Sequence, residues 1–374
     1  MNARDRSAQA DHIAMAGGGA YSLATRGAKD VIDAATPMVL DAIERMELPR
    51  TRKRFHMMDI GCADGGTSLD MVRAALTRVR EIAPRADLTI TYSDQPRNDF
   101  NALVGIVHGL TRFRSYLRDL ERVYPLFSAS SFYAQAVADG ALDLGFSATA
   151  MHWLSAKPSN LAAHVHMVGA DDAERALFAR QAAHDWETIL LHRAREMAPG
   201  ARLVLVNFCR DADGRYLGNT LGDSGGVNMF DLFNQLWREL VESGRIGEAE
   251  YTDMTLPQYY RDCDEFSAPL IDAESKCHRA GLRLERIETR VVPCPFAEAF
   301  KAHGDAERFA DGLIPTLRSW SESVYFGALD PARPMPERRR IINDYYAAYR
   351  ERVLREPQRH GMGYVHAYKT IRKV

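Results

Sequence analysis

The sequence has few cysteines, only five among its 374 residues. None of them belongs to a Cys-x-x-Cys pair, and an odd number argues against the disulfide framework of a small secreted domain. We therefore predict buried, unpaired thiols at Cys62, Cys209, Cys263, Cys277 and Cys294.

The chain also lacks a strong charge of either sign and any long apolar run. Its formal net charge of −2 gives no electrostatic footprint for nucleic acid or for an anionic membrane. No apolar run approaches the length of a membrane-spanning helix, and the polar segment Met1–His12 lacks the hydrophobic region of a signal peptide. We therefore predict a cytoplasmic protein that binds neither nucleic acid nor membranes.

Short apolar strands alternate with amphipathic helices between residues 55 and 208. Apolar residues recur at helical spacing in Leu69–Val79 and Phe100–Val107, and a longer helical stretch covers residues 172–197. The predicted strands span residues 55–60, 88–92, 142–147 and 203–208. This alternation predicts a doubly wound α/β fold with a parallel sheet, whose ligands bind at the carboxyl edge.

A glycine-rich turn follows the first predicted strand, within Met57–Ser68. Its glycines allow a ligand to lie against bare backbone at a helix N-terminus. Asp94 ends the next strand, where a carboxylate can accept the hydroxyls of a ribose. A dinucleotide fingerprint needs a glycine where this chain has Ala63, so S-adenosylmethionine fits better than NAD. An ordinary strand-turn-helix, with glycines for tight packing, is the alternative.

The chain divides into four predicted segments. Residues 1–27 are a glycine-rich candidate lid, with a frayed terminus as an equal alternative. Residues 28–209 form the predicted cofactor-binding α/β domain, and residues 210–281 a helical cap insertion. Residues 282–374 complete the α/β domain and add further cap helices. This last part contains two predicted strands and a charged helix, at 282–292, 363–372 and 338–356.

Short motifs occur in a fixed order along the chain: Met15-Ala16-Gly17-Gly18, Tyr21-Ser22, Asp59-Ile60-Gly61-Cys62, Asp94 to Asn101, Ser131-Phe132-Tyr133, His152-Trp153-Leu154-Ser155 and Leu256-Pro257-Gln258-Tyr259. In this order they resemble the SABATH methyltransferases, which are enzymes of the salicylate, benzoate and theobromine type. The resemblance implies a Rossmann-like sheet of the class I methyltransferase type with a helical cap. It also implies a homodimer that moves a methyl group from S-adenosylmethionine to a small carboxylic acid, or less often to a ring nitrogen.

The resemblance implies a cofactor site at the ends of the predicted strands. Asp94 is expected on the ribose, where a carboxylate suits vicinal hydroxyls. Asp59 and Gly61 are expected under the methionine portion, and Ser131 and Phe132 beside the adenine. A plain core position for Phe132 is the alternative. The full set assigned to the cofactor is Tyr21, Thr25, Asp59, Gly61, Asp94, Gln95, Ser131 and Phe132.

His152 and Trp153 are the predicted catalytic residues, because each offers a ring N–H to a carboxylate oxygen at the ligand-binding edge of the sheet. A satisfied core histidine beside a packing tryptophan is the alternative. The resemblance places Met229 and Phe230 over the substrate ring, with helix packing as the alternative. Trp320 is expected to close the far side of the substrate site.

Two positions of the substrate site depart from the family pattern. Carboxyl methyltransferases of this type often carry a glutamine that grips the substrate carboxylate where this chain has Ala28. Enzymes that methylate salicylate tend to have a tyrosine where this chain has Thr149. Both changes shrink the pocket wall, so we predict an acid different from, or bulkier than, salicylate. Lys29 or a bound water is an alternative source of the missing contact.

A carboxylate acceptor needs no catalytic base, because it is already ionised at neutral pH. The protein then has to align the reactants and exclude water. A neutral amine or phenol would need a base, for which His152 is the candidate. The alternatives are therefore an N- or O-methyltransferase of a heteroaromatic or phenolic metabolite, and a catalytically silent small-molecule binding protein. His164 and His166 have no third ligand at a suitable spacing, so we predict no metal site and a solvated loop.

Overall fold

A mixed β-sheet forms the centre of the protein. The structure is a computed structural model that describes residues 21–22, 25–220 and 225–374. Within these residues seven strands pair in the order β3-β2-β1-β4-β5-β7-β6. Their bounds are β1 Arg54–Ile60, β2 Asp87–Asp94, β3 Val123–Ala129, β4 Leu142–Ala148, β5 Met197–Phe208, β6 Leu282–Val292 and β7 Tyr364–Lys373.

The predicted doubly wound arrangement is confirmed, but the sheet is not wholly parallel. The strands β3, β2, β1, β4 and β5 are parallel neighbours. β7, the last strand of the chain, runs antiparallel between β5 and β6. Apolar periodicity shows that a strand is buried but does not give its direction. The parallel sheet predicted for the strands between residues 55 and 208 is confirmed, whereas no direction was predicted for the two later strands that form this antiparallel edge.

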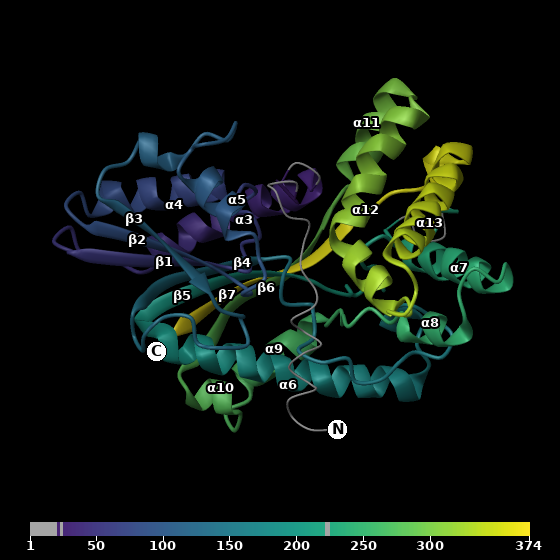
Figure 1. Cartoon of the computed structure of the whole chain (residues 1–374). Coiled ribbons are helices and arrows are strands. Elements are labelled where there is room, and N and C mark those ends of the chain that lie inside the picture. Colours follow the sequence, from purple (N-terminus) through teal and green to yellow (C-terminus); the bar gives the residue numbers. More distant parts are fainter. Residues whose placement is uncertain (1–20, 23–24, 221–224) are drawn as a thin grey trace.

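Helices cover both faces of the sheet (Figure 1). The helices α3, α4 and α5 bury their apolar sides against one face, and α6, α9 and α10 bury theirs against the other. Both faces of the central strands are therefore buried from solvent, as their unbroken apolar runs predict. The bounds of these helices are α3 Arg26–Glu44, α4 Leu69–Ile82, α5 Phe100–Val107, α6 Asp172–Glu196, α9 Cys263–Ile271 and α10 Lys276–Arg279.

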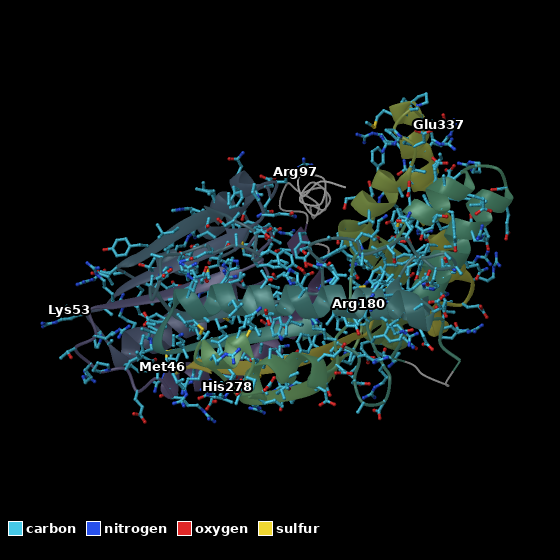
Figure 2. The ribbon with its side chains drawn as sticks, turned by 90° about the horizontal axis from the view of Figure 1, so that it is seen from below. Met46, Lys53, Arg97, Arg180, His278 and Glu337 are labelled. Atoms are coloured by element: carbon cyan, nitrogen blue, oxygen red, sulfur yellow. The ribbon has the colours of Figure 1, made fainter. Side chains whose placement is uncertain are left out.

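A second group of helices lies beyond one end of the sheet. In Figure 2, Lys53, next to β1, and Glu337, in this group, lie at opposite ends of the molecule. The group is held by interlocking aromatic rings, such as Tyr325 and Tyr345, whose centroids are 4.5 Å apart. It draws on both residues 210–281 and residues 282–374. Its helices are α7 Met229–Glu242, α8 Glu248–Asp253, α11 Pro295–His303, α12 Ala306–Ala328 and α13 Met335–Arg355.

The cysteines carry no disulfide in the described part of the chain. All five are free, and all except the partly exposed Cys263 are buried, which agrees with the prediction of unpaired thiols. Among the helices of the described residues, none is both long and apolar enough to cross a lipid bilayer.

Candidate functional site

A cavity opens where the carboxyl ends of β1, β2 and β4 meet. The chain leaves β1 toward β2 and β3 on one side and returns to β4 on the other, and open α/β sheets bind ligands at this kind of crossover. We call this space, of about 800 Å³, the first cavity. Its lining includes Tyr21, Gly61, Ala63, Asp94, Gln95, Ser131, Phe132, Thr149 and Trp153.

The turn after β1 has a backbone that only a small residue allows at its first position. Gly61 has a φ of +74°, and a Cβ added there would come within 2.6 Å of the Ala150 Cβ. Ala63 also has a positive φ, of 49°. This conformation turns the Ala63 N–H toward the Asp94 Oδ2, which accepts from it at 2.7 Å. The turn and the end of β2 are thus locked together.

Asp94 is fixed in place with acceptor capacity left over. Its Oδ2 accepts from the Ala63 N–H and its Oδ1 from the Gln95 N–H, both at 2.7 Å. A carboxylate oxygen can accept a second bond, so both oxygens can still accept from a ligand in the first cavity. Burial raises the pKa of the Asp94 carboxyl, against the two backbone hydrogen bonds, which favour its ionised form.

Asp59, near the end of β1, is not among the lining residues of the first cavity. Its Oδ2 accepts from the Ser68 hydroxyl at 2.5 Å, next to the start of α4. Burial raises the pKa of Asp59 to about 7, although the bond from Ser68 favours the ionised form. Its predicted contact with the methionine portion of a cofactor stays a prediction.

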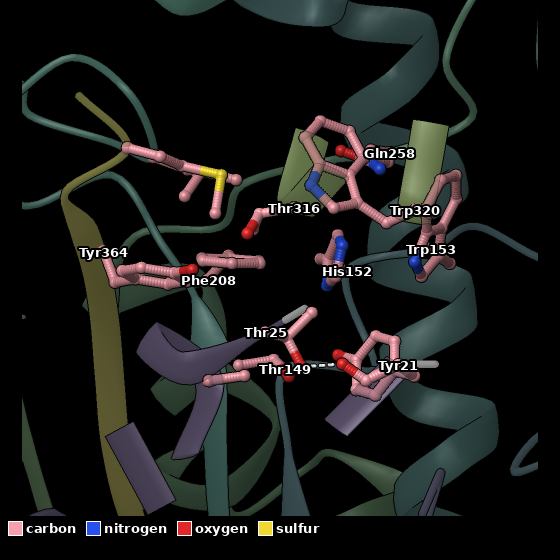
Figure 3. Close-up of a pocket in the computed structure, with 13 residues that line it drawn as sticks. Tyr21, Thr25, Thr149, His152, Trp153, Phe208, Gln258, Thr316, Trp320 and Tyr364 are labelled. Carbon is pink, nitrogen blue, oxygen red and sulfur yellow. Dashed lines mark hydrogen bonds between the residues drawn. The ribbon is translucent and has the colours of Figure 1, made fainter. Parts of the chain in front are cut away.

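A second cavity, of about 460 Å³, adjoins the first. Tyr21, Thr149 and Trp153 line both, so the two spaces meet at these residues. Figure 3 shows Gln258 and Trp320 above His152, and Thr25, Thr149 and Tyr21 below it. Of the described residues that line the second cavity, none carries a formal charge at neutral pH. It is therefore an uncharged and largely apolar space beside an anionic one.

His152 is a neutral imidazole in this setting. Burial, and then the nearby Arg261 guanidinium, lower the pKa of His152 to about 3. Its ring packs edge-on against Phe208, with centroids 4.8 Å apart. Its Nδ1 finds no hydrogen-bond partner among the described residues. His152 can donate one N–H to a ligand, but it cannot contribute a positive charge.

The junction of the cavities contains a strained residue. Thr149 has a φ of +59°, which is rare for a β-branched side chain and points to a functional position. Its N–H donates to the Val206 carbonyl at 2.9 Å, which holds this backbone. Burial raises the pKa of the Tyr21 phenol to about 12, while a hydrogen bond with Thr149 opposes the rise. Tyr21 is therefore a neutral phenol here.

The segment that carries Tyr21 is tied to the turn after β1. The Ser22 N–H donates to the Asp64 Oδ2 at 3.0 Å, and the Ser22 hydroxyl donates to Oδ1. Most of the predicted lid, residues 1–20 and 23–24, lies outside the described residues. Asp64, next to Ala63 in this turn, therefore anchors the chain that brings Tyr21 to both cavities.

The predicted site residues Thr25, Met229 and Phe230 do not line the cavity to which they were assigned. Ala28, Thr149 and Trp320 line the second cavity, but Thr25, expected at the cofactor, lines the second cavity and not the first. Met229 and Phe230, expected over the substrate, appear in neither lining and are buried in α7.

Phe230 instead stacks on the ring of His166, with centroids 3.9 Å apart. It reaches Trp320 with centroids 6.4 Å apart, so it supports a lining residue from behind. The packing of α7 into the helical group, which the sequence left open as an alternative, accounts for these positions of Met229 and Phe230.

Sequence reasoning missed nearly half of the second cavity's lining. Gln258 belongs to a motif of the resemblance, but no role was predicted for it. Phe208 could have been predicted, because it is the last residue of β5 and the carboxyl ends of parallel strands lie at the ligand-binding edge of the sheet. The others come from loops and helices whose approach to the sheet leaves no local pattern. The missed residues are Phe208, Leu217, Gln258, Thr316, Met362 and Tyr364.

The two histidines after Pro158 are not on a solvated loop. His164 and His166 are buried, so that prediction was wrong. The turn folds under α7, where the His166 ring stacks on Phe230 and the His164 Nδ1 lies 2.8 Å from the His166 carbonyl oxygen. In the described ranges, no three His, Cys, Asp or Glu side chains are grouped as a metal site requires.

Comparison with known proteins points to one family. A family described as SAM dependent carboxyl methyltransferase matches residues 10–310. Methyltransferase LUC1 of Fusarium sp. is 26% identical over 68% of this chain and 66% of its own length. Indole-3-acetate O-methyltransferase 1 of Oryza sativa subsp. japonica is 28% identical over 61% of each chain. The chain thus spans about two thirds of the length of these curated relatives.

The fold has a counterpart among solved structures. Loganic acid methyltransferase with SAH superposes with a TM-score of 0.75 at 19% sequence identity. The superposition covers 96% of this chain and 98% of that one. At this identity the likeness shows that the two chains share a fold.

Proposed function

Because this chain belongs to the family of S-adenosylmethionine-dependent carboxyl methyltransferases, we propose that it methylates the carboxylate of a small, largely apolar organic acid. The observation that carries the proposal is the pair of joined cavities. One contains the fixed carboxylate of Asp94, and the other has no formal charge among its described lining residues. They meet at Tyr21, Thr149 and Trp153, which is where a methyl group would pass from one to the other.

The first cavity fits the cofactor of the family, S-adenosylmethionine. Asp94 has the remaining acceptor capacity that two ribose hydroxyls require. Phe132 offers an aromatic face, and Ser131 a hydroxyl, on the β3 side where the adenine would lie. Gly61 gives the close approach to backbone that the methionine portion needs. The anionic Asp94 also complements a cofactor that carries positive charge.

When bound, the cofactor supplies a methyl group carried on a positively charged sulfur. A carboxylate oxygen of the acid would attack this methyl carbon in line with the C–S bond, and the sulfur would leave as S-adenosylhomocysteine, giving a methyl ester. His152 and Trp153 hold the carboxylate through neutral N–H donors, which leave its negative charge available for attack. Tyr21 and Thr149 confine the path between the cavities. The apolar lining excludes water, and alignment of this kind supplies up to about 7–11 kcal/mol in well-oriented systems.

A neutral amine or phenol as acceptor fits the site less well. Such an acceptor would need a general base whose pKa lies near the working pH. The pKa of His152 is lowered to about 3, which makes its imidazole a poor base, and Tyr21 remains protonated. The chemistry of these side chains therefore supports an acceptor that is already ionised.

We expect the pH dependence of the methylation rate to show no titration of His152. At saturating cofactor and acid we expect His152 to add no pH dependence to turnover between pH 8 and pH 6, because the pKa of His152 lies below this window. Asp59, with a pKa raised to about 7, does titrate there, so Asp59→Asn is the control. An inflection near pH 6.5 that persists in Asp59→Asn would show that His152 changes its charge in the working enzyme.

The second cavity supports an acid bulkier than salicylate. Ala28 and Thr149 give its wall only short side chains at two positions. The relative named indole-3-acetate O-methyltransferase supports an aromatic acid of bicyclic size.

We expect indole-3-acetate or longer acids to be methylated with a higher kcat/KM than salicylate or benzoate, by about tenfold. The measurement uses labelled cofactor and a panel of aromatic and aliphatic acids. Ala28→Gln, which adds a polar side chain to the wall, should narrow this difference. A wild-type preference for salicylate over every larger acid would contradict the assignment.

We further propose that the protein acts in the cytoplasm as a homodimer, with residues 210–281 and the later cap helices closing over the acid. The resemblance supports the dimer, and the free cysteines are consistent with a reducing compartment. One chain has a mass of 42.0 kDa. Sedimentation at the mass of a single chain at micromolar concentration would rule out a stable dimer.

A further inference from the structure

Gln258 lies beside Trp153 through a short backbone pairing. The two residues form an antiparallel β-bridge, flanked by bonds from the Leu154 N–H to the Pro257 carbonyl at 2.7 Å and from the Tyr259 N–H to the His152 carbonyl at 3.0 Å. Residues directly opposite in such a pair project their side chains to the same side. Both side chains line the second cavity, as Figure 3 shows.

One end of the Gln258 amide is paired and the other is not. Its Oε1 accepts from the Tyr260 hydroxyl at 3.2 Å, which orients the amide group. Its Nε2 is buried and has no hydrogen-bond partner among the described residues. A buried amide donor without a partner is rare in folded proteins and calls for an explanation.

The neighbouring His166 does not provide that explanation. Burial lowers the pKa of His166 well below its usual range, and a side-chain hydrogen bond with Gln258 opposes this shift. The Gln258 Nε2 is nevertheless left without a hydrogen-bond partner among the described residues. Gln258 instead lines a cavity whose wall, among the described residues, holds no Lys or Arg.

The same wall lacks a donor at position 28, where this chain has alanine. Ala28 lines the second cavity and offers no polar side-chain atom. A carboxylate held there by His152 and Trp153 alone would have two neutral donors for oxygens that accept about four bonds. A third donor beside Trp153 would help to replace the water lost on binding.

We propose that the Gln258 Nε2 donates to the carboxylate of the acid substrate and so supplies the contact that Ala28 cannot make. This assignment rests on the proposed carboxyl methylation. Gln258 is then a substrate-binding residue, held in register with Trp153 by their backbone bridge and oriented by the Tyr260 hydroxyl.

The test compares wild type, Gln258→Met, Ala28→Gln and the double variant. Methionine keeps the length of the side chain and removes the donor. We expect Gln258→Met to raise KM for the best acid by about ten- to a hundredfold, as for the loss of a hydrogen bond to a charged group. Ala28→Gln should recover most of this loss in the double variant. Gln235→Met, at an exposed position of α7, is the matched control and should behave as wild type.

Calorimetry of the acid with the complex of protein and S-adenosylhomocysteine provides a readout without turnover. Weaker acid binding in Gln258→Met with rescue by Ala28→Gln supports the assignment, because a purely structural glutamine would not be replaced from another element. Equal acid affinity in wild type and Gln258→Met overturns it, even when methylation proceeds. Acid binding that depends on Gln258 without any methyl transfer would support the contact and overturn the proposed function.

Discussion

Replacing Asp94 with alanine is expected to weaken the binding of S-adenosylmethionine by about a hundredfold, or about 3 kcal/mol. Each hydrogen bond to the carboxylate contributes about 1.5–3 kcal/mol, and water recovers part of two such bonds when they are lost. The side chain lines the first cavity and is held by the N–H groups of Ala63 and Gln95. Calorimetric titration with S-adenosylmethionine and with S-adenosylhomocysteine measures the effect.

Two further variants separate binding from folding. Asp94→Asn keeps an acceptor oxygen and should lose less affinity than Asp94→Ala. Asp87→Ala removes a carboxylate from the other end of the same strand, where it pairs with Arg122, and should leave affinity unchanged. Affinity for both ligands that survives intact in Asp94→Ala would remove Asp94 from the cofactor site.

Truncating Trp153 to alanine is expected to lower kcat/KM for the acid by about a hundredfold or more. The variant loses both an N–H donor and a wall shared by the two cavities, and a displacement of reactants of about 1 Å can cost about a hundredfold. Trp153→Phe keeps most of the wall and loses only the donor, so about a tenfold loss is expected. His152→Gln, which keeps a donor near the same place, should also lose less than Trp153→Ala.

Steady-state kinetics and cofactor titrations on the same preparations decide between the two cavities. Cofactor affinity should change far less than kcat/KM, because Asp94 and the turn after β1 are untouched. Leu110→Ala, at a side chain that is 79% exposed, serves as the control. Normal rates in both Trp153→Ala and His152→Gln on the true substrate would place the acid elsewhere.

The fold was largely predictable because its central strands are continuous apolar runs. β1, β2, β4 and β5 were located within a few residues, apart from the start of β5 at Met197, six residues before the predicted strand. β3 was not found. It contains Pro125 and exposes Tyr124 and Leu126, as an edge strand can, so neither its composition nor its burial resembles that of its neighbours.

The site could be predicted only where its functional side chains lie at the end of a strand or shortly after it in the sequence. Asp94 is the last residue of β2, His152 and Trp153 follow β4 by a few residues, and all three line a cavity. Thr316 and Trp320 reach the second cavity from α12, and Met362 and Tyr364 from the region that enters β7. Their positions depend on how the helical group packs against the sheet, through contacts between segments far apart in sequence. Trp320 was found through the resemblance alone, and the others were missed.

The cofactor side and the acid side of the proposed site differ in charge. The carboxylate of Asp94 lies on the cofactor side, while the described lining on the acid side is formally uncharged. The attraction between a bound acid and the cofactor's positive sulfur is therefore not weakened by a competing cation of the protein. This arrangement favours monocarboxylic acids over acids with a second charge.

The central claim is methyl transfer to a carboxylate, and the chemical nature of the product tests it most directly. The purified protein is incubated with S-adenosylmethionine labelled in its methyl group and a panel of monocarboxylic acids, and the products are treated with mild base. The account predicts a labelled product that base converts back to the acid with release of labelled methanol. A labelled product that survives this treatment, or none from any acid while the cofactor still binds, would contradict it.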